Sequence, residues 1–165
     1  MNSNVVTYRP PNQTDLQFVI ASWLKSTRNS DFCTYIPNPT YYKYMDHLIK
    51  TIINRSLVTM ICDPEDLSHI YGYIVYEFLG DNTIFVLHFA YMKLPYRKLH
   101  IMEAALTAVY PDFGKEDSFI TNLDRTNYYT ILDRVTNKPI VKRDGWFIKK
   151  RNQYKLNYNP FLLVR

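Results

Sequence analysis

The chain has 165 residues, of which 47% are hydrophobic, and it carries a formal net charge of +5. A chain of this length buries about two-thirds of its unfolded surface, so we expect one domain over residues 1–165. Only 4 glycines are present, which excludes a glycine-rich phosphate loop and the dinucleotide fingerprint.

Several further site classes are excluded by what the sequence lacks. No apolar run reaches the roughly 18 residues of a membrane span, and the N-terminus shows no basic-then-apolar signal pattern. The two cysteines, Cys33 and Cys62, do not make a disulfide framework. The histidines show no metal-ligand spacing. We therefore expect a cytoplasmic protein with no membrane association and no metal site.

The first part of the chain predicts one strand followed by two helices. The predicted elements are a strand at Val5–Tyr8, a helix from the capping box Thr14–Gln17 to Thr27, a loop over Arg28–Pro39, and a helix from Tyr41 to about Asn54 capped by Thr40. Phe32 and Tyr35 lie in the loop, so we expect the loop to be packed.

Three strands of an antiparallel meander come next. Their residues are β-branched or aromatic and turn sequences separate them, at Leu57–Cys62, Ile70–Leu79 and Ile84–Met92. Side chains alternate between the two faces of a strand. In the third strand this alternation puts His88 on the same face as Val86 and Ala90, and Phe89 on the other face.

The third strand leads directly into a helix. Pro95 is tolerated in the first turn of a helix because it lacks an N–H, and apolar residues recur with helical spacing over Tyr96–Tyr110. A helix N-terminus presents unpaired N–H groups and the positive end of the dipole. We therefore expect an anion to bind there, beside Arg97 and Lys98.

The last third of the chain is predicted to extend the sheet. A strand at Ser118–Leu123 can pair in parallel with Ile84–Met92, because a crossover helix separates them. The other predicted elements are a short helix at Asn127–Val135 and strands at Trp146–Lys149, Tyr154–Tyr158 and Phe161–Val164. The sequence thus predicts an α+β fold with a mixed central sheet of six or seven strands flanked by about four helices.

The junction between strand and helix resembles the coenzyme A pyrophosphate motif of the GNAT superfamily of N-acetyltransferases. That motif reads Arg-x-x-Gly-x-Gly/Ala at the start of a helix, and Arg97 occupies its arginine position. His100 and Met102 replace its two small residues. The phrase Tyr-x-Lys-x-x-Tyr-Arg, from Tyr91 to Arg97, is similar to phage-encoded members. This similarity implies a viral protein in the host cytoplasm.

The resemblance implies a GNAT-like fold with acetyl-CoA as co-substrate. In this family the strands corresponding to Ile84–Met92 and Ser118–Leu123 splay apart, and the pantetheine arm enters between them. The residues that the resemblance assigns to the cofactor are Tyr91, Met92, Lys93, Arg97, Lys98, Leu99, His100, Ile101, Met102 and Asn127. The implied function is transfer of an acetyl group to an amine of a protein, a small molecule or a modified base.

Acetyl transfer to an amine uses a base, and a general acid can protonate the leaving thiolate. His88 is the candidate base, because histidine titrates near neutral pH, and Glu77 on the preceding strand is the acidic alternative. A hydrogen-bonded core histidine is the other interpretation of His88. GNAT enzymes often take the acid from a tyrosine on the helix after the fifth strand; Arg134 stands there, so Tyr128 or Tyr129 is the substitute.

The resemblance also places the Arg28–Pro39 loop over the acceptor site. The acceptor-facing candidates are then Phe32, Tyr35 and Tyr41. The alternative is that these aromatic residues anchor the loop by packing.

The basic character belongs to residues 134–165, which contain nine Lys or Arg and one acid, a net +8, against −3 for the rest. An acidic protein or a nucleic acid is the expected partner of this segment, through Lys142, Arg143, Lys149, Lys150 and Arg151. An amphipathic hairpin with its lysines in solvent is the alternative. A non-catalytic GNAT-fold protein that binds its partner through this segment is the rival function. The 15 tyrosines also favour a homodimer interface.

Overall fold

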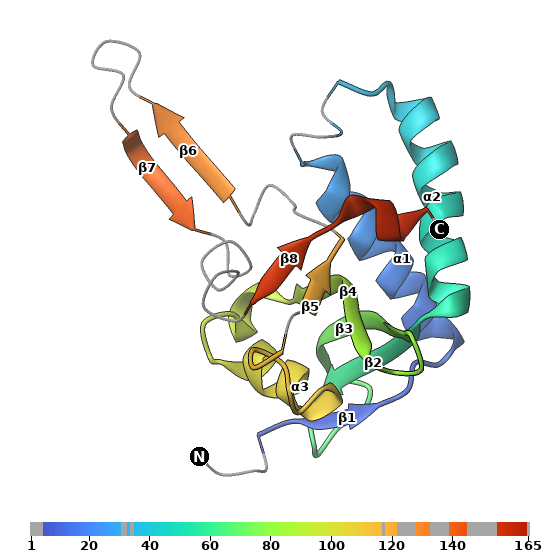
Figure 1. Ribbon diagram of the computed structural model, residues 1–165, viewed down its shortest axis with the longest axis vertical. Coiled ribbons are helices and arrows are strands. Elements are labelled where there is room, and N and C mark those ends of the chain that lie inside the picture. The colour runs from blue at the N-terminus through green and yellow to red at the C-terminus, as the bar shows by residue number, and fades with distance from the viewer. Residues whose placement is uncertain are drawn as a thin grey trace.

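The computed structural model describes residues 5–30, 33, 35–116, 118–121, 128–132, 139–144 and 155–164, with the backbone alone for 128–132, 139–144 and 156. Six strands form a mixed sheet in the order β1-β2-β3-β4-β5-β8 (Figure 1). Their bounds are β1 Thr7–Arg9, β2 Leu57–Cys62, β3 Ile70–Leu79, β4 Ile84–Met92, β5 Ser118–Ile120 and β8 Leu156–Tyr158. Pairing is antiparallel from β1 to β4 and parallel for β4–β5 and β5–β8.

Helices cover both faces of this sheet. They are α1 Gln13–Arg28, α2 Asn38–Arg55 and α3 Ile101–Val109, with 3-10 helices η1 Leu94–Tyr96 and η2 Pro160–Leu163. Two further strands, β6 Tyr128–Leu132 and β7 Pro139–Asp144, pair only with each other (Figure 1). The prediction of an α+β fold with a mixed sheet of six or seven strands is confirmed, and the sheet has six. Three α-helices are described where about four were expected, because residues 128–132 are a strand.

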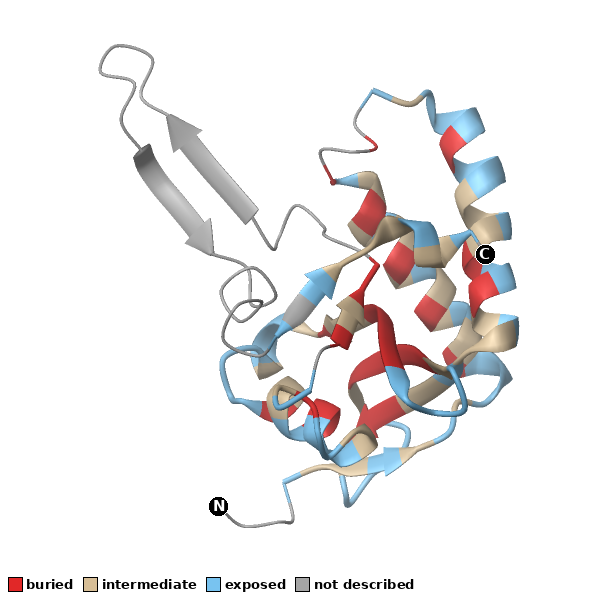
Figure 2. Cartoon of the chain, in the orientation of Figure 1, coloured by how far each residue is buried: buried red, intermediate tan, exposed pale blue. Residues whose placement is uncertain are grey.

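The two faces of the sheet bury separate apolar clusters. On one face Trp23 of α1 and Ile49 of α2 pack with Tyr73 of β3. On the other face Leu106 of α3 packs with Ile74 of β3. The buried residues therefore follow the central strands and the inner sides of the three helices (Figure 2).

A β-bulge interrupts the alternation of β4. The paired residues on its two sides are Val75 with Phe89 and Tyr76 with Leu87. His88 is thus one extra residue in β4, and such an insertion re-aims the side chains that follow. Leu87 packs in the cluster under α3, whereas Phe89 packs in the cluster under α1 and α2. The alternation predicted from sequence held up to Leu87; the prediction that Ala90 lies on the face of His88 is wrong, because Ala90 packs against the α3 cluster.

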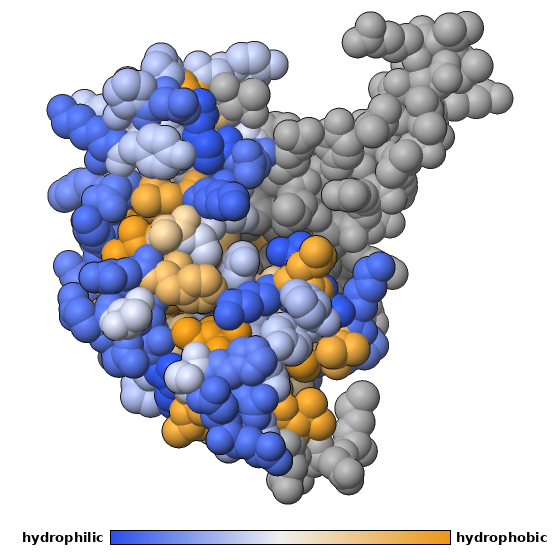
Figure 3. Space-filling view, turned by 180° about the vertical axis from the view of Figure 1, so that it is seen from behind, coloured by the Kyte–Doolittle hydropathy of each residue, from blue (hydrophilic) through white to orange (hydrophobic). Residues whose placement is uncertain are grey.

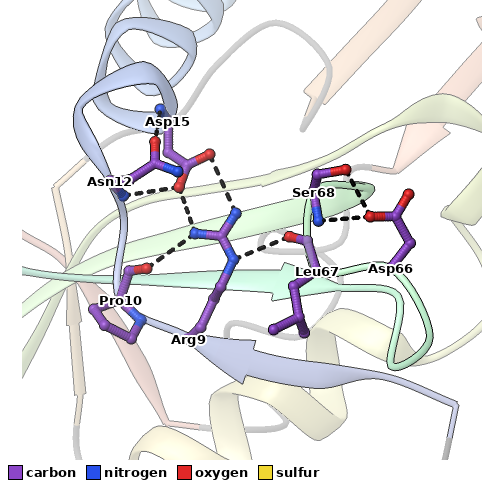
Figure 4. A network of polar contacts seen from close by, with 7 residues as sticks. All are labelled: Arg9, Pro10, Asn12, Asp15, Asp66, Leu67 and Ser68. Atoms are coloured by element: carbon purple, nitrogen blue, oxygen red, sulfur yellow. Dashed lines mark hydrogen bonds and ion pairs between the residues drawn. The ribbon is translucent and has the colours of Figure 1, made fainter.

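The N-terminus of α1 is fixed by a polar network (Figure 4). Asn12 caps the helix and forms a reciprocal capping box with Asp15. Arg9 pairs with Asp15 and also donates to the carbonyl oxygen of Leu67 at 3.0 Å. The Arg9 hydrogen bond holds the pKa of Asp15 below its usual value. The predicted capping box at Thr14–Gln17 is therefore wrong by two residues.

Two predicted helix starts and two predicted element types also differ. The helix expected from Tyr96 begins at Ile101, and the N-cap of α2 is Pro37 where Thr40 was expected. Residues 128–132 form a strand where a helix was predicted, and Phe161 lies in η2 where a strand was predicted. The predicted strand at 146–149 lies outside the described residues.

The surface mixes apolar and polar side chains. Large apolar side chains with more than half of their area exposed include Leu94, Leu99 and Phe161. On the face seen in Figure 3, hydrophobic side chains are exposed in several separate places among hydrophilic ones. Among the described residues, no helix is both long and apolar enough to cross a membrane.

Candidate active site

The turn between β4 and α3 has a backbone shape that few side chains favour. After η1, Lys98 and His100 adopt left-handed conformations with φ of 67° and 58°. Glycine accepts this region most easily, and other L-residues are strained there. Two left-handed residues stop any helix at this point, which explains why α3 begins at Ile101 and why Arg97 lies before the helix.

The N-terminus of α3 carries no capping hydrogen bond from a side chain of the described residues. A helix N-terminus presents unpaired N–H groups and the positive end of the dipole, and Glu103 is the acidic residue in the first turn of α3. His100 stands at the first glycine position of the motif and has a glycine-like φ. Its Nδ1 lies 3.3 Å from Glu103 Oε2, and Met102 packs against the core beneath α3.

The other predicted cofactor residues differ in how far they are exposed, and Tyr91 and Lys93 are intermediate. The exposed ones are Arg97, Lys98 and Leu99, while Met92 and Ile101 are buried in the core under α3. Arg97 uses its Nε to donate to the carbonyl oxygen of Met92 at 2.8 Å. Tyr91 stacks on Tyr73 with ring centroids 5.4 Å apart, and the Lys93 ammonium lies 5.4 Å from the centre of the Phe18 ring. Asn127 lies outside the described residues.

A cluster of polar and aromatic side chains joins η1 to the loop between β2 and β3. The sequence analysis did not predict this cluster. Tyr96 Oη shares a 2.9 Å hydrogen bond with His69 Nε2, and His69 Nδ1 lies 3.6 Å from Asp63 Oδ2. Tyr71 stacks on Tyr96 at 4.0 Å and donates to Asp63 at 2.8 Å. The hydrogen bond to this carboxylate raises the pKa of Tyr71 to about 12. No local sequence signal connects these distant residues.

The two candidate bases meet inside the sheet. His88 is 1% exposed and Glu77 is 4% exposed. His88 Nε2 lies 2.8 Å from Glu77 Oε1, and His88 Nδ1 lies 3.0 Å from Thr121 Oγ1. His88 is therefore a hydrogen-bonded core histidine, as one of the two interpretations of the sequence had it. The same two contacts fix the orientation of the imidazole ring.

Arg55 extends this chain of contacts toward the C-terminal segment. Its Nε lies 3.7 Å from Glu77 Oε1. Its Nη2 donates to the carbonyl oxygens of Leu162 and Leu163, both at 2.9 Å. The polar chain Arg55–Glu77–His88–Thr121 thus joins α2, β3, β4 and the end of β5. Sequence reasoning missed Arg55 and Thr121, because neither stands in a recognisable motif.

The predicted acceptor and acid residues are placed as follows. Tyr41 is buried, and its hydroxyl donates to the carbonyl oxygen of Leu24 at 2.6 Å. Tyr35 is 93% exposed, and Phe32 lies outside the described residues. Tyr128 and Tyr129 lie on β6, so the helical placement expected for a general acid is wrong. In the basic segment, Lys142 and Arg143 lie on β7, and residues 149–151 lie outside the described part.

The parallel pairing of β4 with β5 is short. It comprises Val86 with Phe119 and Leu87 with Ile120, and the Thr121 N–H then donates to the carbonyl oxygen of Leu87 at 3.1 Å. β4 continues to Met92 beyond this last contact. Within the described residues, no group of three or more His, Cys, Asp or Glu side chains could hold a metal ion.

Comparison with known proteins shows a likeness of fold. No family model matches the chain, and no curated protein matches it. The structure resembles a Corynebacterium glutamicum ATCC 13032 protein described as histone acetyltransferase HPA2 and related acetyltransferase, with a TM-score of 0.52, 14% identity and coverage of 84% of this chain and 92% of that one. It also resembles a GNAT-family acetyltransferase of Staphylococcus aureus Mu50, with a TM-score of 0.43, 17% identity and 64% of both chains covered.

The α+β fold with its six-stranded mixed sheet is thus shared with the Corynebacterium glutamicum acetyltransferase structure. A third similar structure is the PaiA N-acetyltransferase of Thermoplasma acidophilum in complex with coenzyme A, with a TM-score of 0.42, 13% identity and coverage of 64% of this chain and 70% of that one. Identities this low show a shared fold alone. Activity has to be argued from the site of this chain.

Proposed function

We propose that the protein is an N-acetyltransferase that uses acetyl-CoA and acts on an amine of a protein, a small molecule or a modified base. The observation that carries the proposal is the left-handed turn at Lys98 and His100, which leads from η1 into the N-terminus of α3, where no side chain of the described residues caps the helix. This arrangement gives a GNAT fold its phosphate-binding backbone without a glycine.

The proposed binding mode uses both the turn and β4. The diphosphate lies at the N-terminus of α3, with the exposed Arg97 and Lys98 supplying positive charge. The pantetheine arm follows β4 beyond Leu87, where the pairing with β5 has ended. The thioester then lies near His88 and Thr121, and the His88–Glu77 pair supplies the base.

Calorimetric titration with acetyl-CoA tests the proposal. Leu99 is 55% exposed beside the turn, and Leu67 is 48% exposed in the loop before β3. A carboxylate at position 99 repels the diphosphate, so Leu99→Glu weakens binding at least about tenfold, a cost of about 1.4 kcal/mol. The matched control Leu67→Glu adds the same charge and leaves the affinity unchanged. Equal affinities of the two variants, or no binding by the wild type at millimolar acetyl-CoA, contradict the proposal.

Two observations favour a second function. His88 and Glu77 are almost fully buried, and larger residues replace both motif glycines. A GNAT-fold protein without activity, which binds an acidic protein or a nucleic acid through residues 134–165, agrees with both facts. Nucleic-acid binding that weakens steeply with salt, together with no acetyl-CoA binding, supports this function.

A further inference from the structure

The C-terminal segment, residues 155–164, contacts the elements at both ends of the buried polar chain Arg55–Glu77–His88–Thr121. β8 pairs with β5, which ends directly before Thr121, and η2 then reaches α2, which carries Arg55 (Figure 1). We propose that this segment is a lid that opens locally and so controls access to the Glu77–His88 pair. The inference rests on the proposed function, which gives that pair the role of base, and it says when the pair is reached.

Arg55 attaches the lid to α2. Its Nη2 donates to the carbonyl oxygens of Leu162 and Leu163, both at 2.9 Å, and its Nε lies 3.7 Å from Glu77 Oε1. The same guanidinium therefore holds the lid and faces the buried carboxylate, whose side chain is 5% exposed. When the lid leaves, Arg55 loses two acceptors, and its charged head turns toward water. Water then reaches Glu77.

The second attachment of the lid is backbone pairing with β5. β8 pairs in parallel with Ser118–Ile120, and the Asn159 N–H donates at 2.9 Å to the carbonyl oxygen of Ile120. The next residue is Thr121, whose hydroxyl lies 3.0 Å from His88 Nδ1. Separation of β8 from β5 makes β5 the edge of the sheet, directly beside the strand that carries His88.

Few apolar contacts hold the lid down. Phe161 is 80% exposed and Val164 is 70% exposed, while Leu163 packs against the cluster under α1 and α2, and Tyr158 packs against the cluster under α3. β8 has 3 residues and η2 has 4. Segments with few buried apolar contacts open locally at a free-energy cost below that of global unfolding, and lids are drawn from such segments.

Lys155 is the hinge of the lid. Its φ of 49° is a left-handed conformation, which is strained for a lysine. Its carbonyl oxygen accepts a hydrogen bond from the Ser118 N–H at 3.0 Å, so the first contact between the lid and β5 holds the strained residue in place. Loss of that contact lets Lys155 return to an unstrained conformation, which favours opening.

Amide hydrogen exchange, followed by NMR, tests the lid. We expect the Asn159 amide to exchange faster than the amides of β3, which open only with the whole sheet. Leu163→Ala removes an apolar contact of the lid and speeds Asn159 exchange about tenfold or more. Val164→Ala, a matched truncation of the neighbouring exposed side chain, leaves the rate unchanged. Arg55→Lys keeps a positive charge near Glu77 with a shorter side chain, and it speeds Asn159 exchange as well.

Modification of His88 by diethyl pyrocarbonate, followed by mass spectrometry, measures access to the buried pair. His88 is 1% exposed, so it reacts slowly in the wild type. We expect it to react about tenfold faster in Leu163→Ala than in Val164→Ala, in step with the exchange of the lid. The exposed histidines react equally in both variants and are the internal references: His47, His69 and His100.

Local opening and control of access fail in distinguishable ways. An Asn159 amide that exchanges only as fast as the amides of β3, or equal rates in Leu163→Ala and Val164→Ala, overturns the lid. Equal acceleration of the β3 amides in Leu163→Ala also overturns it, because the whole fold then opens. Faster exchange of the lid without faster modification of His88 overturns the control of access. Neither measurement uses acetyl-CoA, so a failure of acetyl-CoA to bind overturns the cofactor site and leaves the lid in place.

Discussion

Two regions of the molecule bring functional groups together in opposite ways. In the sheet, Glu77, His88 and Thr121 are buried side chains whose distances are set by strand pairing. In the turn before α3, the groups that matter are backbone N–H groups, and the side chains around them are exposed. The first region depends on which residues are present. The second depends on a left-handed backbone conformation that Lys98 and His100 adopt although it is strained for both residue types. Substitutions in the two regions should therefore have different effects.

The largest effect is expected from removing the carboxylate in the sheet. Glu77→Ala removes the carboxylate that forms an ion pair with Arg55 and a hydrogen bond with His88, and breaking a buried charge pair by removing one partner costs about 3 to 5 kcal/mol of unfolding free energy. Urea unfolding measures this cost. Glu65→Ala, in the exposed loop before β3, is the control and should stay within about 0.5 kcal/mol of wild type. Equal stabilities of the two variants would show that the sheet region does not depend on its side chains.

A smaller effect on stability is expected from substitutions in the turn, where one substitution should stabilise the fold and another should destabilise it. His100→Gly relieves the left-handed conformation and stabilises the fold by about 0.5 to 1 kcal/mol, while His100→Val costs about 1 to 2 kcal/mol because a branched side chain is strained there. Thermal unfolding compares both with wild type. Ala104→Gly on the exposed side of α3 should destabilise by about 1 kcal/mol. A loss of stability in His100→Gly would contradict the assignment of strain.

The contacts between η1 and the loop before β3 should contribute less to the stability of the fold. Tyr96→Phe removes the hydrogen bond to His69 and keeps the stacking on Tyr71, so it costs about 0.5 to 1 kcal/mol. Chemical unfolding measures this difference, and Tyr42→Phe on the exposed side of α2 is the reference. A loss no larger than that of the reference would mean that the hydrogen bond does not hold the turn.

The smallest effect is a change in pH dependence. The hydrogen bond to Asp63 raises the pKa of Tyr71 from 10.0 to about 12. A raised pKa stabilises the fold below the unfolded value, and this contribution is lost as the pH rises from 10 toward 12. We expect Tyr71→Phe to lose stability less steeply than wild type over that interval in unfolding experiments. Equal slopes of stability against pH for Tyr71→Phe and wild type between pH 10 and pH 12 would contradict the raised pKa of Tyr71.

Much of the fold could be predicted because its signals are local. The three strands from Leu57 to Met92 were predicted with the bounds that the structure shows, since β-branched residues and turn sequences mark them. The start of α3 could not be predicted, because His100 adopts a conformation that its residue type disfavours. The helix predicted at 127–135 failed for a related reason, since short segments follow their tertiary context more than their propensity.

The sequence by itself determined the order of the elements from β1 to β5, the amphipathic helices and the meander, because each is encoded by residues close together in the chain. Tertiary structure alone decided that His88 meets Glu77, Thr121 and, through Glu77, Arg55, since these residues come from different strands and a helix. A single inserted residue in β4 turned a predictable alternation into this arrangement. Strand register depends on pairing across the whole sheet, and no local pattern specifies it.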